Sequence, residues 1–556
     1  MHMSVSTAPE QAPPVDVGPK PRPDLVLVLG SVLVVGIVVA ALLIWPDSAK
    51  DSANMLFNGS TRIFGVPVQA LGLGCLLMAV VFAASRIGSI KLGEGKPQYS
   101  TPAWLFMFIT AGLGSATMYW AFMEWAYYYL TPGLNITPES REALDMSTAY
   151  VFFHWGPIPW AMYVVAGVSM AYYFHVRKGK RLSYAGNVEA VTNGRLKADG
   201  LAGRIIDILF LFGTFGSLIL TVTLTVNTVS AGVSGLAGTG DSLWLKTIIL
   251  LSSALVFGIS SYLGLDSGLQ RLAKLAVGAT FVFGAIIFLI GPTEFIAHNT
   301  LNAFGLEIQN FVHMSLFTDP TEGGSFARDW TVFYWLYWLS YLPGVAIFIA
   351  RVSKGRTIRQ TVIGLICGGC AGILVFFGPL TSFAIDRTTS GAINVPQVLQ
   401  DKGGDFAVAE LLASLPLGAV FSVAYFIIML LFLASHLDAT AFTISTVSTK
   451  HLPHGSDPAR GFRLFWVLML VTLPFAMIAI DADLGVLKTG LTLTAVPFIF
   501  LIVAQIIGLV RWLRNDMQYL DPATGLMRLP AALLGADASD NPTHTNSEES
   551  THHADH

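Results

Sequence analysis

Aromatic side chains gather in three apolar stretches of this 556-residue chain. Tyr334, Trp338 and Tyr341 recur at helical i, i+4 and i+7 spacing and so share one face of a helix, and two further clusters cover 120–129 and 153–163. A desolvated cation gains about 2 kcal/mol or more from an aromatic face, and a methylated ammonium has no N–H to offer another partner. The pattern favours recognition of a quaternary ammonium. Interfacial belts of Trp and Tyr, usual in membrane proteins, explain only the outermost rings.

Ionisable residues in apolar stretches are the second candidates, because charge at bilayer depth is costly and usually faces a cavity or a partner. Glu124, Lys274, His436 and Asp438 are placed in this way. Each also has a structural interpretation: Glu124 could cap a backbone, Lys274 could extend its ammonium to the interface, and the other two could hydrogen-bond across helices. His436 and Asp438 are two positions apart, so they do not face each other as an acid–base pair. We therefore expect no catalytic residue, no metal and no cofactor.

The composition indicates a protein that spans a membrane. Hydrophobic residues make up 53% of the chain and charged residues 12%, with a mean hydropathy of +0.62, whereas soluble domains carry about 25% charged residues. The net charge of −3 gives no reason to expect nucleic acid as a partner. A spanning helix needs about 20 mostly apolar residues. Twelve stretches qualify: 25–45, 66–85, 103–125, 148–174, 205–231, 243–263, 271–291, 330–350, 358–385, 414–447 (long enough to tilt or break), 463–482 and 485–512.

The distribution of Lys and Arg orients these stretches. The loops after the second, fourth, eighth and tenth stretches hold most of the basic residues, which predicts that they and both termini are cytoplasmic. The polar ends, 1–24 and 513–556, are predicted to be disordered tails of a transmembrane domain over 25–512. Residues 293–317 mix polar and apolar positions at helical spacing, which favours a helix lying along the interface. We expect a multi-pass protein of the cytoplasmic (inner) membrane.

The third stretch contains the glycines Gly112 and Gly114 at its middle. Small residues there permit close packing between helices. They also permit a helix to unwind at mid-membrane, where broken helices bind ions and substrates in many transporters. Periodicity leaves both interpretations open.

Several motifs in register resemble the betaine/choline/carnitine transporter family. They are Trp330-Thr331-x-x-Tyr334-Trp335-x-Tyr337-Trp338, Ala350-Arg351-x-Ser353-x-Gly355-Arg356-Thr357-x-Arg359, His154-Trp155-Gly156-Pro157-x-Pro159-Trp160, and the glycine-rich third stretch with Glu124. The resemblance covers roughly 25–512. It implies an all-α protein of twelve transmembrane helices, with two inverted five-helix repeats at about 103–291 and 330–512. It also implies a homotrimer in which 293–317 lies at the contact between protomers.

The resemblance also implies which residues bind the substrate. The aromatic box consists of Tyr127, Trp155, Tyr337 and Trp338, with Trp160 and Tyr163 beside it, and Trp335 and Tyr341 line the path toward the cytoplasm. Transport then proceeds by alternating access, as the two repeats rock about a fixed site. The expected function is secondary transport of a betaine, carnitine or choline type of compound; the alternative is a sodium- or proton-coupled symporter of the same fold for another small zwitterion, such as an amino acid or a sulfonium compound.

Departures from the family pattern leave the coupling open. Tyr337 stands where the family usually has Trp, and Trp125 stands where it commonly has Pro. Ser435 and His436 occupy the positions at which sodium-dependent members have adjacent hydroxyl residues. The stretch from Tyr127 onward looks most like the carnitine-type branch, which exchanges substrates without sodium; there Lys274 or Arg271 could replace the ion, beside Gly112 and Gly114. Pro343 is more typical of sodium-coupled members. Sodium-independent exchange, sodium coupling and proton coupling through His436 remain alternatives.

Overall fold

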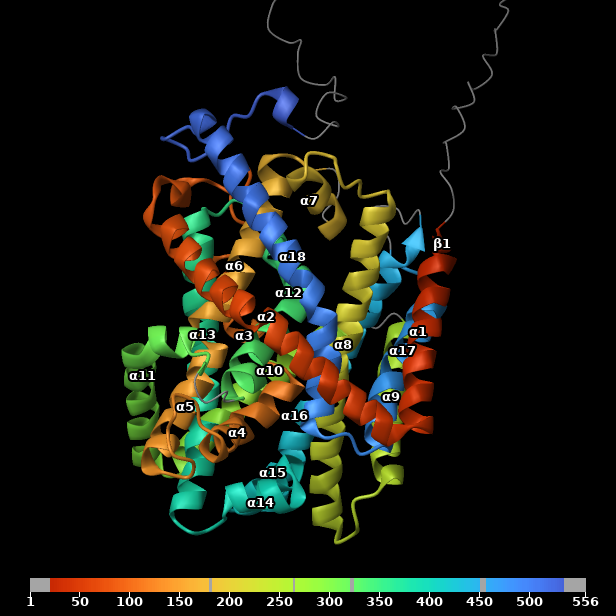
Figure 1. Cartoon of the computed structure of the whole chain (residues 1–556), viewed down its shortest axis with the longest axis vertical. Helices are drawn as coiled ribbons and strands as arrows, with labels where there is room; N and C mark the ends of the chain where they lie inside the picture. Colours follow the sequence, from red (N-terminus) through yellow and green to blue (C-terminus); the bar gives the residue numbers. More distant parts are fainter. Residues whose placement is uncertain (1–20, 180–182, 264–265, 321–324, 451–456, 535–556) are drawn as a thin grey trace, which may run out of the picture.

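The computed structural model describes residues 21–179, 183–263, 266–320, 325–450 and 457–534, and these are almost entirely helical (Figure 1). The twelve predicted stretches all lie wholly or largely in helices. Their bounds are α1 Leu25–Ile44, α2 Pro46–Ala84, α3 Thr101–Ala111, α4 Ser115–Leu130, α5 Arg141–Trp155, α6 Pro157–Ala171, α8 Leu201–Ala237, α9 Leu243–Leu263, α10 Asp266–Ile290, α12 Phe333–Val352, α13 Ile358–Thr389, α16 Gly418–Val447, α17 Arg460–Ala479 and α18 Leu484–Asp516.

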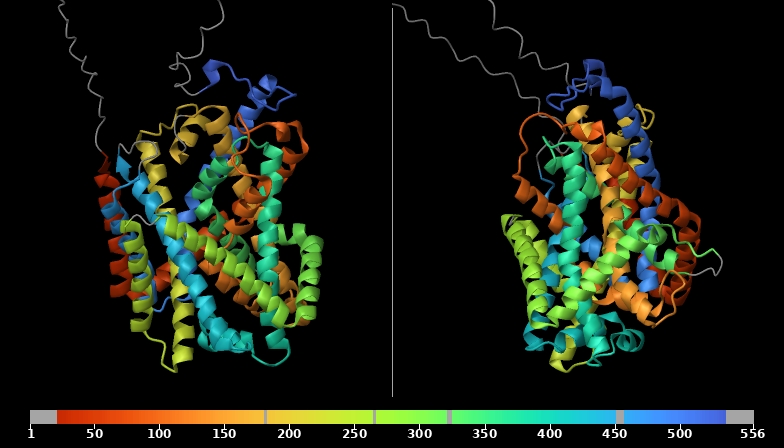
Figure 2. Two further views of the ribbon diagram at one scale, coloured as in Figure 1. Left: turned by 180° about the vertical axis from the view of Figure 1, so that it is seen from behind. Right: turned by 90° about the vertical axis from the view of Figure 1, so that its left-hand side faces the viewer.

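Shorter elements connect these helices. α11 (Thr293–Leu316) occupies the predicted interfacial segment, and it stands at the edge of the molecule in both Figure 1 and Figure 2. The helices α14 (Val395–Lys402) and α15 (Gly404–Ala413) close one end of the molecule, while α7 (Tyr184–Val191) and the last turns of α18 lie at the other. The remaining elements are the π-helical turns η2 (Tyr172–Val176) and η3 (Ala327–Val332), the 3-10 turns η1 (Arg86–Ser89), η4 (Met517–Tyr519) and η5 (Ala531–Leu533), and the paired strands β1 (Arg22–Pro23) and β2 (Thr449–Lys450).

Length and hydropathy agree with a membrane-spanning bundle. Within the described ranges, nine helices are long and apolar enough to cross a membrane. Two further pairs pass the same test together but are bent, by 61° between α3 and α4 and by 113° between α10 and α11. α1 shows what surrounds the bundle: Leu25, Val26, Leu29 and Leu33 are each more than 60% exposed. A continuous apolar surface of this kind fits contact with lipid rather than water.

Several predicted boundaries differ from the structure. α2 has 39 residues and starts twenty positions before the predicted 66, because its polar first half continues the same helix. α16 runs unbroken from Gly418 to Val447. The predicted tails include ordered residues: Arg22 and Pro23 pair with β2, Asp24 caps α1, and the Lys91 backbone N–H donates to the carbonyl of Gly525 at 2.7 Å. Residues 1–20 and 535–556 lie outside the described part.

Two breaks in spanning helices meet in the middle of the bundle. The chain is not helical between Ala111 and Ser115, and α5 gives way to α6 at Gly156. The second break follows from Pro157 at the first position of α6, because proline has no N–H for the preceding turn and fits a helix start. A Cβ atom at Gly112 would approach Cζ2 of Trp160, at the start of α6, to 3.0 Å. The two breaks therefore border one region.

Candidate substrate site

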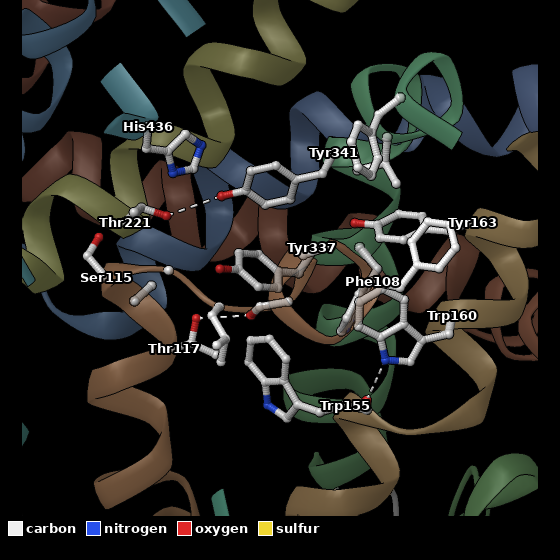
Figure 3. Close-up of a pocket in the computed structure, with 18 of the residues that line it drawn as sticks. Phe108, Ser115, Thr117, Trp155, Trp160, Tyr163, Thr221, Tyr337, Tyr341 and His436 are labelled. Atoms are coloured by element: carbon white, nitrogen blue, oxygen red, sulfur yellow. Dashed lines mark hydrogen bonds between the residues drawn. The ribbon is translucent and has the colours of Figure 1, made fainter. Parts of the chain in front are cut away.

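A cavity of about 220 Å³ lies between the two breaks and α12 (Figure 3). Its walls combine aromatic rings, glycine backbone and a few hydroxyl groups. The residues around it are Phe108, Ala111, Gly112, Leu113, Gly114, Ser115, Ala116, Thr117, Trp155, Trp160, Tyr163, Thr221, Tyr337, Trp338, Tyr341, Val345, Phe348, Leu365 and His436.

Four aromatic residues form one continuous wall. The ring of Trp338 lies 5.4 Å from that of Trp155, 5.1 Å from Trp160 and 5.1 Å from Tyr163, measured between centroids. Trp160 and Tyr163 are 6.0 Å apart in an edge-to-face arrangement. Aromatic pairs at such separations support one another beyond simple burial. The wall offers the π surfaces that attract a cation.

Each indole N–H of this wall has a partner behind the cavity. Trp155 Nε1 donates to Glu124 Oε2 at 2.7 Å, and Trp160 Nε1 donates to the carbonyl of Trp155 at 3.0 Å. Trp338 Nε1 donates to the carbonyl of His154 at 3.1 Å. Buried indole groups need such partners, and these hydrogen bonds orient the three rings.

Glu124 anchors a buried polar network behind the wall. Its carboxylate accepts from Tyr128 Oη at 2.5 Å as well as from Trp155. Tyr128 Oη also lies 2.7 Å from His154 Nδ1, and His154 Nε2 lies 3.0 Å from Thr331 Oγ1. Because a buried carboxylate is costly without partners, these contacts explain how Glu124 is tolerated. They make it a positioning residue for Trp155.

The opposite wall is the unwound segment between α3 and α4. α4 begins at Ser115, and Thr117 Oγ1 donates back to the carbonyl of Gly112 at 3.2 Å (Figure 3). The Ser115 hydroxyl is buried beside the cavity and has no hydrogen-bond partner within the described part of the chain. The first amides of a helix also lack intrahelical acceptors. Of the two interpretations of Gly112 and Gly114, the unwound helix is therefore the one observed.

One end of the cavity is polar. The hydroxyls of Tyr341 and Thr221 are 3.2 Å apart, and the imidazole of His436 lies 5.7 Å from the Tyr341 ring (Figure 3). Asp438, two residues further along α16, instead pairs with Arg463 at 2.9 Å. His436 thus borders the cavity, whereas Asp438 forms an ion pair outside it, as expected for residues two positions apart on a helix.

Nine of the site residues predicted from the sequence line the cavity. Four others lie elsewhere. Tyr127 hydrogen-bonds Tyr119, at 2.7 Å between the two hydroxyls, and Trp335 packs against Phe153 at 5.4 Å. The Ser435 hydroxyl donates to the carbonyl of Leu431 in its own helix at 2.9 Å. The nine in the cavity are Gly112, Gly114, Trp155, Trp160, Tyr163, Tyr337, Trp338, Tyr341 and His436.

The fourth residue outside the cavity is Lys274, whose side chain is exposed on α10. The side chain of Arg271 lies outside the described residues. Sequence reasoning passed over Thr221 and Ser115, whose hydroxyls are ordinary in spanning helices. It also passed over Lys488, a cation near the start of the apolar stretch 485–512, although charge within such a stretch was a usable signal.

Comparison with known proteins identifies the family. A model described as BCCT, betaine/carnitine/choline family transporter, matches residues 26–518. The chain belongs to this family. It is therefore an all-α membrane transporter with twelve spanning helices and not an enzyme, as the sequence motifs predicted.

Three known proteins illustrate the relationship. The uncharacterized transporter YeaV of Escherichia coli (strain K12) is 48% identical over 439 residues, 79% of this chain and 91% of the relative. A carnitine transporter of Acinetobacter baumannii is 45% identical over 493 residues, 89% of each chain. A solved structure, of a Na⁺-coupled sialic acid symporter in a substrate-bound outward-open state, has 14% identity and a TM-score of 0.37, covering 73% of this chain and 86% of its own. That last likeness is too low to inform the site.

Proposed function

We propose that this transporter carries a zwitterionic quaternary ammonium compound of the carnitine or betaine type. The observation that carries the proposal is the aromatic wall of Trp155, Trp160, Tyr163 and Trp338 opposite an unwound helix. A methylated ammonium cannot donate a hydrogen bond, so aromatic faces are its natural partners. A relative 45% identical over 89% of the chain is named a carnitine transporter, which supports the same substrate class.

The other end of the substrate would face the polar part of the cavity. The start of α4 carries unpaired amides and the positive end of its helix dipole, which favour a carboxylate. The Ser115 and Thr221 hydroxyls and the imidazole of His436 add hydrogen-bonding groups there. A free primary ammonium would gain less from this cavity, since the described lining contains no carboxylate to receive its N–H groups.

Alternating access would open this site first to one face of the membrane and then to the other. The two repeats, about 103–291 and 330–512, would rock around the cavity, and the breaks at Gly112–Gly114 and Gly156 would give the hinges. In the same proposal the chain lies in the cytoplasmic membrane with both termini inside, and α11 joins protomers in a homotrimer.

The site favours transport that does not depend on sodium. The Ser435 hydroxyl is engaged within α16, and its neighbour His436 contributes an imidazole to the cavity where a sodium-binding member would offer a hydroxyl. Sodium prefers oxygen ligands, as other hard cations do. Because His436 lines the cavity, proton coupling is the second candidate and makes uptake depend on a pH gradient.

Uptake into proteoliposomes tests the proposal. Labelled carnitine, glycine betaine and choline are offered with and without a sodium gradient, with and without a pH gradient, and with vesicles either empty or loaded with unlabelled substrate. We expect uptake that loading stimulates and that neither gradient changes. His436→Gln is the matched variant, because proton coupling would lose its gradient dependence in it. Failure of all three compounds to enter or bind would contradict the quaternary-ammonium proposal.

A further inference from the structure

A buried lysine near the start of α18 is held by aromatic rings. Lys488 is only 5% exposed. Its Nζ lies 3.3 Å from the centroid of the Trp330 ring and 4.7 Å from that of Phe333, and it donates to the Asp329 carbonyl at 2.9 Å. A protein that recognises a cation through aromatic rings thus already encloses a cation of its own in the same way.

No carboxylate of the described ranges forms an ion pair with this ammonium. The acidic groups of Asp329 and Glu124 act on the Lys488 charge from beyond ion-pair distance. Removing an ammonium from water costs several kcal/mol unless something replaces the hydration. Here the replacement is two ring faces and one carbonyl oxygen, so the position depends on cation–π attraction.

Rings connect this cage to the substrate site. Trp330 lies 5.0 Å from Tyr128 and 6.4 Å from Tyr334, and Tyr334 lies 5.7 Å from Trp155, the first ring of the cavity wall. Trp330 is 5% exposed and Tyr334 is fully buried. Packed rings therefore connect the cavity wall to the Lys488 cage.

The backbone beside the cage is irregular. Asp329 and Trp330 belong to η3, a π-helical turn that leads directly into α12. Such turns are rare and occur frequently at functional sites. The Lys488 ammonium joins α18 to this turn through both the ring of Trp330 and the carbonyl of Asp329. It thus forms a polar link between two segments that would have to separate for this side to open.

We propose that Lys488 is a tethered cation that holds the substrate route closed on the side of α14 and α15 by occupying the Trp330–Phe333 cage. The proposal rests on the proposed function, since it assumes that this side opens during transport. Opening requires the ammonium to leave both rings. Removing the charge while keeping the volume of the side chain therefore shifts the population toward the state open on this side.

Hydrogen–deuterium exchange of the full-length protein in nanodiscs measures this opening directly. Lys488→Met keeps a flexible side chain of similar length that packs well on aromatic rings, whereas Lys488→Arg keeps the charge. In Lys488→Met we expect amide exchange across 326–336 to rise by roughly tenfold or more, the change expected from loss of a desolvated cation–π contact. Lys488→Arg should stay within about threefold of the unmodified chain by the same reasoning. Lys402→Met is the matched control, because its exposed ion pair with Glu410 lies at the same end of the molecule.

A chemical rescue separates the charge from the packing. Lys488→Ala leaves room for a free alkylammonium, so adding n-propylammonium chloride should restore protection of 326–336, and sodium chloride at equal concentration should not. Unchanged exchange in Lys488→Met, an equal rise in Lys488→Met and Lys488→Arg, or absence of rescue would each overturn the proposal. Binding of carnitine, glycine betaine and choline is measured by calorimetry on the unmodified protein. Absence of that binding contradicts the proposed function, whereas the exchange results alone decide the role of Lys488.

Discussion

The aromatic face that begins at Trp330 and continues along α12 has two halves that meet opposite surroundings. Trp330 and Tyr334 are packed into other rings: Trp330 lies 6.1 Å from Trp120, and Tyr334 also lies 6.1 Å from it. Tyr337 and Tyr341, further along the same face, border the cavity instead. Both halves carry the same kinds of side chain on one continuous segment, yet one half is filled and the other is open.

The difference comes from what stands across from each half. The filled half faces the helical part of α4, where large rings such as Trp120 and Tyr128 occupy the space. The open half faces the unwound segment 112–114, where Gly112 and Gly114 on either side of Leu113 place no side chain in the space. Protein interiors are packed to near-crystalline density, so two glycines opposite large rings leave an unfilled cavity. The backbone break in one helix therefore decides which part of another helix borders the cavity.

Among these changes, replacing Trp338 should weaken substrate binding in the open half most. Trp338→Ala removes the ring that contacts Trp155, Trp160 and Tyr163. Losing a desolvated cation–π contact of about 2 kcal/mol, together with the support of its neighbours, should weaken carnitine binding by roughly 30-fold or more. Calorimetry on the purified protein measures this, with Trp338→Phe as the conservative variant that retains part of the affinity. Equal binding by Trp338→Ala and the unmodified protein would show that this ring does not contact the substrate.

Glu124, behind the aromatic wall, supports rings of both halves, because it accepts hydrogen bonds from Tyr128 and Trp155. Glu124→Gln keeps the shape but replaces one of the two acceptor oxygens by an NH2 group, so Tyr128 and Trp155 can no longer both donate to this side chain. A buried donor left without a partner costs about 1–3 kcal/mol, so binding should weaken about tenfold while the protein still folds. Asp438→Asn, which alters a carboxylate outside the cavity, is the comparison. If the two variants bound substrate equally well, Glu124 would not position Trp155.

Adding volume to the unwound segment should make the open half resemble the filled one. The Cβ atom of Gly112→Ala would press on Trp160 at 3.0 Å. Overpacking of this kind costs about 1–3 kcal/mol. We therefore expect Gly112→Ala to lower the substrate affinity roughly fivefold. Gly36→Ala on α1 is the control, because nothing lies within 4 Å of its Cβ position. Uptake assays that find no difference between the two variants would show that the cavity tolerates extra volume.

Stability at the end of the molecule that α14 and α15 close should depend on pH. Burial raises the pKa of Asp405, in the first turn of α15, to about 6. The folded protein therefore holds this proton more tightly than the unfolded chain, so stability is highest below pH 4, falls as pH rises toward 6 and is then constant. The loss is at most about 3 kcal/mol, and smaller because the side chain is partly exposed.

Thermal unfolding midpoints between pH 4 and 7 measure this dependence. Asp405→Asn should be more stable than the unmodified protein at pH 7, and the difference should shrink toward pH 4. Asp401→Asn, on the exposed surface of α14, controls for general effects of pH. A difference between Asp405→Asn and the unmodified chain that does not vary with pH would contradict the assignment.

The sequence alone determined the helices, the family and most of the rings around the cavity. Hydropathy suffices to predict spanning helices, because a helix needs about 20 apolar residues to cross the bilayer, whichever helices pack against it. Spacing also placed Tyr334, Trp338 and Tyr341 on one helix face. Short helices such as α14 and α15 carried no comparable signal, since their 8 and 10 residues are too few for the hydropathy of a spanning helix.

Only the tertiary structure decided which members of an aromatic face reach the cavity. Tyr127 and Trp335 have the same residue types as their neighbours, but Tyr127 hydrogen-bonds Tyr119 in its own helix and packs on Trp330, and Trp335 packs on Phe153. The position of Lys488 against Trp330 was equally beyond the sequence, because the two residues are 158 positions apart. Hydrophobicity and spacing say which face of a helix is buried, whereas the volume of the opposing side chains decides whether that face is packed or open.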